Sequence, residues 1–449
     1  MSKMAPGRGS ADPGRCAGEI MSGYAEFLER KRRVWAGAGI ESADLPERLF
    51  DWQAAIVRWA LRKGRAAIFA DCGLGKTPMQ LAWAQATGQR TLILAPLCVA
   101  DQTAAEGAKF GIPVHYAADQ SQAGPGISVT NYERLHLFDP SAFGAVVLDE
   151  SSILKSFDGK TRSALIAAWG RTRFRLCCTA TPAPNDIAEL ANHAEFLGLV
   201  TRSEFLATWF VHDDEGWRMK KHAVKPFYRW LASWAVALRH PSDLGYPDDG
   251  FILPELRIHD AVIPAGGPMG GMLFPSMAVK GIQGRLAARR GSLTDRVAAA
   301  ASLMNGHDSW IAWCGLNQES EALAAAVPDA LEVCGNDSYA EKVGAVHSFV
   351  NGETRALVTK ARILGFGMNF QHCSRMVFVG LSDSYETYYQ CIRREWRYGQ
   401  TQPVDVWIVV SEAEQAIVDN VRRKEQTAAS MARDLLAEMT EFEREELTA

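Results

Sequence analysis

Short apolar runs alternate with helical patterns along most of this chain, and polar residues follow each run. The runs are almost continuously hydrophobic, as expected for strands of a parallel sheet that is covered on both faces. They lie at residues 66–70, 91–95, 126–130, 145–148 and 175–178, and again at 309–314, 355–359, 375–379 and 404–410. In open α/β sheets ligands bind where the strands end. The pattern therefore predicts two α/β lobes, each with polar residues gathered at the ends of its strands.

The region between the two groups of runs has a different composition. It is rich in tryptophan, and no acidic residue occurs between Trp217 and His240, where six cations lie. A Gly/Pro stretch at 264–271 then resembles a linker. We expect the following division: a disordered tail (1–22), lobe one (23–200), a basic connector (201–272), lobe two (273–411) and C-terminal helices (412–449).

Composition narrows the class of protein. The 449 residues are 47% hydrophobic and 22% charged, which is ordinary for a globular protein. No apolar run approaches the ~20 residues of a membrane helix, and the N-terminus lacks the apolar core of a secretory signal. Nine cysteines without a C-x-x-C pair indicate reduced, buried thiols in a cytoplasmic protein. The net charge of −4 gives no global sign of nucleic-acid binding, so such a role must come from local basic patches.

The segment Ala70–Thr77 carries the clearest chemistry. A buried strand leads into a loop with Gly73 and Gly75, and a helix opens at Lys76. In such a loop the backbone N–H groups around Gly73, Leu74 and Gly75 surround phosphate oxygens, lysine reaches the β- and γ-phosphates, and the Thr77 hydroxyl ligates Mg²⁺. The sequence thus predicts a nucleoside triphosphate site, although Ala70 stands where the general pattern has glycine.

Two further motifs supply what hydrolysis of ATP requires. Asp149 and Glu150 end an apolar strand, and we assign Asp149 to Mg²⁺ and Glu150 to orienting the attacking water. Positive charge for the γ-phosphate comes from Arg394 and Arg397 in lobe two. These arginines are three residues apart, so on a helix they would point the same way.

Together these motifs resemble superfamily-two helicases of the Swi/Snf DNA-translocase type, and most closely the compact DEAD-like helicases of phages and prophages. The resemblance covers about residues 24–425. It implies two tandem RecA-like lobes with ATP in the cleft between them, and a helical C-terminal extension. Residues Ala70–Thr77 then match the helicase form of the phosphate loop, in which alanine replaces the first glycine. Gln53 matches the glutamine that reads adenine, and Gly367 lies in a lobe-two motif that touches ATP. Gln390 matches the arginine-finger helix together with Arg394 and Arg397.

The resemblance also implies roles in coupling and in nucleic-acid contact. Thr179 and Thr181 match the segment that couples hydrolysis to movement. Ser152 stands where many relatives have a histidine that joins the ATP site to this segment, and a serine would make that contact less strongly. The residues implied to contact nucleic acid are Pro96, Thr130, Asn131, Tyr132 and Asn369. From charge alone we add Lys220, Lys221 and Arg239, for which a solvated helix face is the alternative. Trp230 and Trp234 are expected to pack in the core.

We therefore expect a Mg²⁺-dependent ATPase that moves along DNA as a monomeric motor. It would act in the cytoplasm of a bacterial or phage-infected cell, with replication or recombination proteins as partners. Arg393, where glycine is frequent, and Ser151–Ser152 depart from the family pattern. Three alternatives remain: an RNA helicase, a hydrolysis-deficient module that binds ATP and DNA, and a metabolic P-loop kinase. A metabolic P-loop kinase fits less well, because paired arginines in a second lobe are not expected there.

Overall fold

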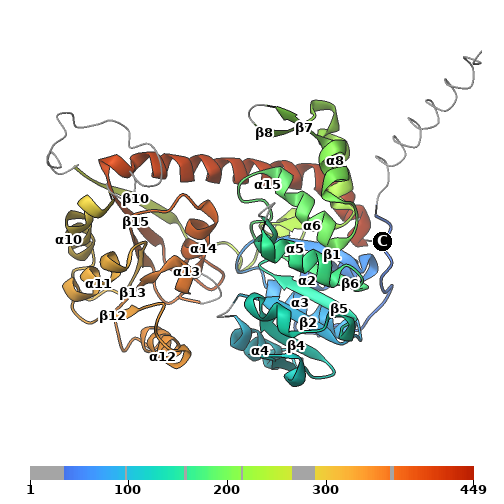
Figure 1. Ribbon diagram of the computed structural model, residues 1–449, viewed down its shortest axis with the longest axis horizontal. Helices are drawn as coiled ribbons and strands as arrows, with labels where there is room; N and C mark the ends of the chain where they lie inside the picture. The colour runs from blue at the N-terminus through green and yellow to red at the C-terminus, as the bar shows by residue number, and fades with distance from the viewer. Residues whose placement is uncertain are drawn as a thin grey trace, which may run out of the picture.

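The computed structural model describes residues 35–96, 99–155, 159–213, 216–264, 289–364 and 369–448. Figure 1 shows two lobes side by side, with one long helix lying across both. Each lobe is built on a parallel sheet flanked by helices, which confirms the predicted fold class. The expected tail at 1–22 lies outside the described residues.

Lobe one contains a seven-stranded sheet in the order β3-β4-β2-β5-β6-β1-β9, with every neighbouring pair parallel. Its strands are β1 (Arg65–Ala70), β2 (Thr91–Ala95), β3 (Val114–Tyr116), β4 (Ile127–Asn131), β5 (Ala145–Asp149), β6 (Phe174–Cys178) and β9 (Ala235–Leu238). Its helices are α2 (Asp51–Lys63), α3 (Lys76–Ala86), α4 (Ala100–Lys109), α5 (Lys160–Trp169), α6 (Leu190–Leu197), α7 (Arg202–Trp209) and α8 (Val224–Ala232). The central strands are buried throughout, because helices cover both faces.

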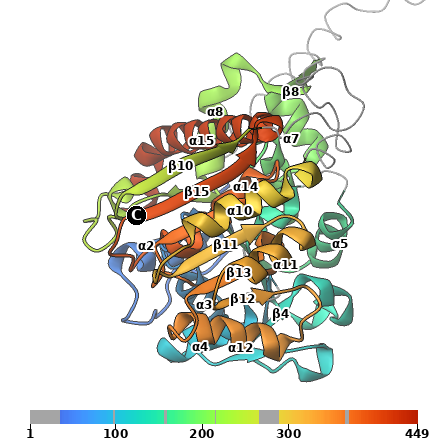
Figure 2. The same cartoon turned by 90° about the vertical axis from the view of Figure 1, so that its left-hand side faces the viewer.

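Lobe two contains a six-stranded sheet in the order β10-β15-β14-β11-β13-β12, again wholly parallel. Figure 2 shows this sheet facing the viewer. Its strands are β10 (Leu256–Ile263), β11 (Trp310–Cys314), β12 (Ala330–Val333), β13 (Ala356–Lys360), β14 (Arg375–Val379) and β15 (Val404–Ser411). Its helices are α10 (Leu293–Leu303), α11 (Asn317–Ala326), α12 (Tyr339–Val350), α13 (Ala361–Leu364) and α14 (Tyr385–Glu395).

The segment expected to be a connector, 201–272, contributes a strand to each sheet. Strand β9 pairs with β1 at one edge of the first sheet, and β10 pairs with β15 at one edge of the second. A small antiparallel hairpin, β7 (Phe210–Asp213) with β8 (Gly216–Met219), stands apart from both sheets. Trp230 and Trp234 pack against each other in the lobe-one core, with ring centroids 5.3 Å apart. Trp230 and Trp234 therefore belong to the hydrophobic core of lobe one, as expected from the sequence.

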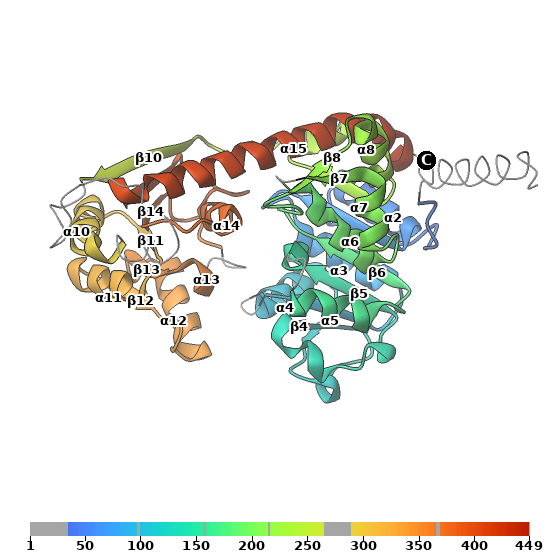
Figure 3. The same cartoon turned by 45° about the horizontal axis from the view of Figure 1, so that its top comes forward.

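The C-terminal extension is a single helix, α15 (Gln415–Thr448), which crosses from one lobe to the other (Figure 3). Ile417, Val418 and Val421 are buried in the core of lobe two, whereas Leu435 is buried in the core of lobe one. The helix thus joins two hydrophobic cores. Within the described residues, no helix combines the length and apolar character needed to cross a membrane.

Replacing Leu435 with alanine should loosen lobe one, since a buried leucine lost from a core costs about 2–5 kcal/mol. We expect hydrogen exchange to speed up in α8 and β9, which contact α15, and to change little in β13. Asp434→Ala, an exposed change at the neighbouring position of the same helix, is the control. An equal loss of hydrogen-exchange protection in both lobes would contradict the view that α15 packs into each lobe separately.

Candidate active site

A cavity of about 380 Å³ lies between the lobes at the ends of β1 and β5. Lobe one lines it with the phosphate loop and the two carboxylates predicted from the sequence. Lobe two lines it with both predicted arginines. The predicted site residues that face this cavity are Gln53, Gly73, Gly75, Lys76, Thr77, Asp149, Glu150, Asn369, Arg394 and Arg397. Gly367 lies outside the described residues.

The phosphate loop turns between β1 and α3, and two glycines have the left-handed backbone that it needs. Gly73 has φ +88° and Gly75 has φ +73°, values that favour glycine. A Cβ at Gly75 would lie 2.4 Å from Gln53 Nε2. A Cβ at Gly73 would lie 2.8 Å from the backbone nitrogen of Tyr398, which belongs to lobe two. Gly73 therefore permits the close approach of the second lobe.

Lys76 points back over the loop that precedes it. Its Nζ donates to the carbonyl oxygens of Ala70 at 3.0 Å and Asp71 at 3.4 Å. Burial alone lowers the pKa of Lys76, but the neighbouring Cys72 thiol and the carboxylates around it together raise this pKa above its ordinary value. The ammonium group is therefore protonated and close to where phosphate oxygens would bind.

Asp149 is buried at the end of β5, and Glu150, which follows it, is half-buried. Gln80 Nε2 donates to Asp149 Oδ1 at 2.6 Å, and the Tyr132 hydroxyl donates to the Asp149 carbonyl oxygen at 2.7 Å. Burial raises the pKa of both Asp149 and Glu150, and Lys76 partly offsets this rise. Glu150 has φ +53°, a strained value for a residue with a side chain. Such strain is typical of functional sites.

The segment expected to couple hydrolysis to movement contacts Glu150 directly. Thr179 Oγ1 donates to Glu150 Oε2 at 3.2 Å, and Thr181 N donates to Thr179 Oγ1 at 3.1 Å. Ser152 Oγ reaches only the Glu150 carbonyl oxygen, at 3.5 Å. Glu150 itself is therefore hydrogen-bonded to the segment that contains Thr179 and Thr181.

Ser151 is linked to a different buried group. Its Oγ lies 3.1 Å from Nε2 of His193, on α6, and burial lowers the pKa of His193 to about 4. The imidazole is therefore neutral near pH 7. No sequence pattern pointed to this histidine, because it lies 42 positions from Ser151 on another element.

The arginines reach the cavity from two different elements. Arg394 lies on α14 and is held by Gln390, whose Oε1 accepts from Arg394 Nη2 at 2.8 Å. Helix α14 ends at Glu395, so Arg397 lies in the turn that follows. The shared helical face expected for this pair is therefore wrong, although both line the cavity. Burial, followed by the charge of Arg394, lowers the pKa of Arg397 to about 10.

Gln53 supports the loop from α2. Its Nε2 donates to the Leu74 carbonyl oxygen at 3.0 Å, and its Oε1 accepts from Phe50 N at 3.1 Å. Four aromatic side chains that the sequence did not single out also line the cavity: Phe50, Phe110, Phe251 and Tyr398. Phe251 and Tyr398 stack with centroids 4.8 Å apart, across the two lobes. An isolated Phe in a loop carries no pattern that could have revealed this contact.

These side chains fit a magnesium–nucleotide complex. The carboxyl groups of Asp149 and Glu150 have a raised pKa, so a nearby cation would favour their ionised form. A hydroxyl from Thr77 and a carboxylate from Asp149 face the same cavity, and both are oxygen ligands of the kind Mg²⁺ prefers.

Several residues expected to contact nucleic acid lie elsewhere. Thr130 and Asn131 are buried at the end of β4, and Tyr132 is buried against Asp149. Asn369 lines the cavity between the lobes, and Pro96 is half-buried after β2.

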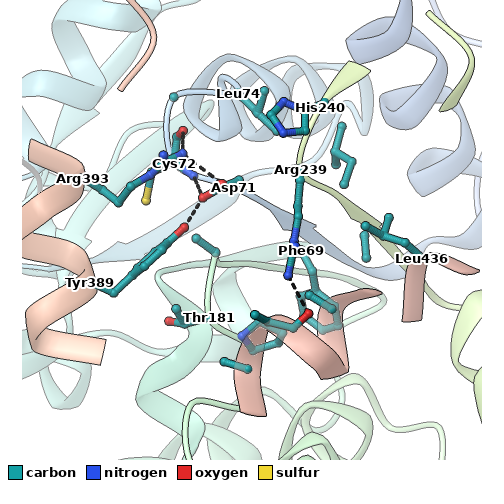
Figure 4. A pocket seen from close by; sticks show the side chains of 18 of the residues that line it. Phe69, Asp71, Cys72, Leu74, Thr181, Arg239, His240, Tyr389, Arg393 and Leu436 are labelled. Carbon is teal, nitrogen blue, oxygen red and sulfur yellow. Dashed lines mark hydrogen bonds and ion pairs between the residues drawn. The ribbon is translucent and has the colours of Figure 1, made fainter. Parts of the chain in front are cut away.

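The three basic residues chosen from charge differ among themselves. Lys220 Nζ donates to the carbonyl oxygens of Ala207 and Thr208, at 2.6 and 3.2 Å. Arg239 Nη2 donates to the Ala429 carbonyl oxygen of α15 at 2.9 Å, which places it inside a second inter-lobe cavity (Figure 4). Lys221 is exposed.

Comparison with known proteins identifies one part of the chain. Residues 318–399 match the family model of the helicase conserved C-terminal domain, a segment that includes α14 and Arg397. No curated protein matches the chain. One similar solved structure is the Sulfolobus solfataricus SWI2/SNF2 ATPase core in complex with dsDNA, at 18% identity and a TM-score of 0.42. The match covers 91% of this chain and 98% of that one. A likeness of this size carries no argument about function.

Replacing Asp149 with asparagine should stabilise the protein in magnesium-free buffer. A carboxyl whose pKa is raised by folding binds more protons when folded, so its stabilising contribution is lost as pH rises through the folded pKa. The neutral amide removes this cost, so we expect the free energy of unfolding at pH 7 to rise relative to wild type. Urea titrations at pH 5 and pH 7 would measure it.

The exposed change Asp249→Asn is the control and should alter stability by less than about 0.5 kcal/mol. A loss of stability in Asp149→Asn at pH 7 would contradict the charge argument.

Proposed function

We propose that this protein is a helicase-like ATPase that hydrolyses Mg-ATP and uses the energy to move along DNA. The observation that carries the proposal is the composition of one cavity. Lys76, Asp149 and Glu150 line it from lobe one, and Arg394 and Arg397 line it from lobe two. Each group that phosphoryl transfer to water requires is thus represented in one place.

The roles follow from the chemistry of each side chain. Lys76 and the loop N–H groups bind the β- and γ-phosphates, and Gln53 and Phe50, which line the same cavity, would hold the base. Thr77 and Asp149 would hold Mg²⁺, which when bound neutralises charge on the phosphate oxygens. Glu150 orients and polarises the attacking water. Arg394 and Arg397 stabilise the charge that develops on the transferred phosphoryl group.

Hydrolysis would be linked to movement because the site belongs to both lobes. The arginines act only while lobe two lies against lobe one, so closing and opening would accompany each cycle. Thr179 supports this link, since its hydroxyl bonds Glu150 while the residues that follow it line the second inter-lobe cavity. Loss of the γ-phosphate would therefore alter the contacts of Glu150 with Thr179 and so of the segment that lines the second inter-lobe cavity.

DNA is proposed as the track on two grounds. Residues 318–399 match the helicase C-terminal domain, and Arg397–Gln400 has the Arg-Tyr-Gly-Gln ending of Swi/Snf-type translocases. Lys221 and Lys225 are exposed beside the β7–β8 hairpin and could contribute phosphate contacts.

Lys76→Ala and Glu150→Gln should each abolish ATP hydrolysis, the first by removing a phosphate contact and the second by removing the group that orients water. Phosphate release would be measured with duplex DNA, single-stranded DNA or RNA present. We expect duplex or single-stranded DNA to stimulate the wild-type rate more than RNA. Fast turnover that ignores added DNA would overturn the motor proposal, and preferential stimulation by RNA would indicate an RNA helicase.

Arg394→Ala should lower kcat by about 10³-fold, since an arginine at the transferred phosphoryl group is worth ~10³–10⁵ in rate. The affinity for ATP should change much less, because Lys76 and the loop remain. Rates at saturating ATP and DNA, together with nucleotide-binding titrations, separate the two effects. Arg433→Ala, an exposed arginine on α15, is the matched control. A kcat within about threefold of wild type would exclude Arg394 from the reaction.

A further inference from the structure

Arg393, beside the proposed arginine finger, reaches across the cleft to lobe one. Its Nη2 lies 3.0 Å from Asp71 Oδ2 and donates to the Cys72 carbonyl oxygen at 2.7 Å. Arg393 is 4% exposed, so solvent screens this ion pair little. Figure 4 shows the guanidinium meeting the loop at Asp71 and Cys72. A residue that departs from the family pattern thus makes a buried contact between elements 321 positions apart in sequence.

The receiving carboxylate is itself part of the phosphate loop. Asp71 Oδ1 accepts from the backbone N–H of Cys72 at 2.6 Å, and this bond shapes the turn that leads to Gly73. The Tyr389 hydroxyl, one helical turn before Arg393 on α14, donates to the same oxygen. One carboxylate therefore receives a local donor and two donors from lobe two.

The arginine is also held on its own side of the cleft. Its guanidinium carbon lies 4.8 Å from the ring centroid of Trp396 and 5.8 Å from that of Tyr389. Such cation–π contacts limit the conformations of a long side chain. These ring contacts therefore orient the forked guanidinium group of Arg393 toward the phosphate loop.

We propose that Arg393 is a positioning residue, which fastens α14 to the phosphate loop and so sets where Arg394 meets the nucleotide. Adjacent residues on a helix point in different directions, so one anchors the helix while the other faces the reaction. Arg393 lines the cavity wall, but the contacts described for its Nη2 are to protein groups of lobe one. Its catalytic consequence rests on the proposed function, whereas its effect on lobe closure does not.

The first test measures closure without nucleotide. Dyes attached through unnatural amino acids at the exposed positions 171 and 321 would report the distance between lobes by single-molecule FRET in the full chain. Arg393→Ala and Asp71→Asn should each raise the ratio of open to closed molecules roughly tenfold or more, as expected for a hydrogen bond to a charged group. Because the two residues share one ion pair, the effect of the double variant should be smaller than the sum of the two single effects.

Arg257→Ala is the matched control, because Arg257 pairs with Asp405 at 3.0 Å inside lobe two. It should leave the inter-lobe distance unchanged. An unchanged distance in Arg393→Ala, or effects of Arg393→Ala and Asp71→Asn that simply add, would overturn the proposal.

The second test separates positioning from mere stability. In Arg393→Ala, kcat should fall at least about tenfold while KM for ATP changes less than about threefold, because Lys76 and the loop still bind the phosphates. Arg393→Lys should recover part of kcat, since it keeps the charge but loses the fork. Equal losses in the lysine and alanine variants, or a change confined to KM, would contradict the assignment. If the wild type does not hydrolyse ATP, the proposed function fails, and the distance measurement still decides the contact.

Discussion

The close approach of lobe two to the phosphate loop is the constraint on which the site depends. At Gly73 the loop passes so near Tyr398 that a single Cβ would lie 2.8 Å from the Tyr398 backbone nitrogen. A backbone atom cannot rotate away, so a side chain at this position would push the lobes apart. The absence of a Cβ at Gly73 therefore permits the approach of lobe two, in which Arg394 and Arg397 share a cavity with Lys76 and the two carboxylates.

Charge in this cavity comes from both lobes. In lobe one, Lys76 faces the carboxylates of Asp149 and Glu150 in this cavity, and burial raises the pKa of both acids. Arg394, from lobe two, lowers the pKa of both and so offsets part of this cost. The same arrangement suits a magnesium–nucleotide complex, whose charges would complete the balance.

Two further contacts hold the lobes together at different distances from this cavity. The Asp71–Arg393 ion pair joins the phosphate loop to α14, directly beside the arginines. Helix α15 joins the hydrophobic cores, with Val421 buried in one and Leu435 in the other. Since α15 carries an apolar anchor in each lobe, opening of the cleft would require the helix to bend or one anchor to slide. The polar contact near the nucleotide is the easier one to break and remake, because water can replace it.

Sequence alone determined the local chemistry. The apolar runs predicted two lobes of parallel sheet, since a strand covered on both faces must be hydrophobic at every position. Two motifs were recognisable because each is contiguous in sequence and is shaped by its own local backbone. They are the loop around Gly73, Lys76 and Thr77, and the acidic pair Asp149 and Glu150. Arg394 and Arg397 were found by their motif, although the helical face assumed for them was wrong.

Tertiary structure decided which groups meet. Strand β9 has only four residues, so its pattern was too short to reveal that it pairs with β1. The basic character of Lys220 and Arg239 suggested solvent or phosphate, yet both donate to carbonyl oxygens, because a charged side chain can satisfy its donors wherever backbone acceptors lie. Arg393 stood out in sequence only as an unusual residue. Its partner, Asp71, lies far from Arg393 in sequence, and only the folded structure brings the two within hydrogen-bonding distance. The periodicity of a sequence carries no information about such a long-range contact.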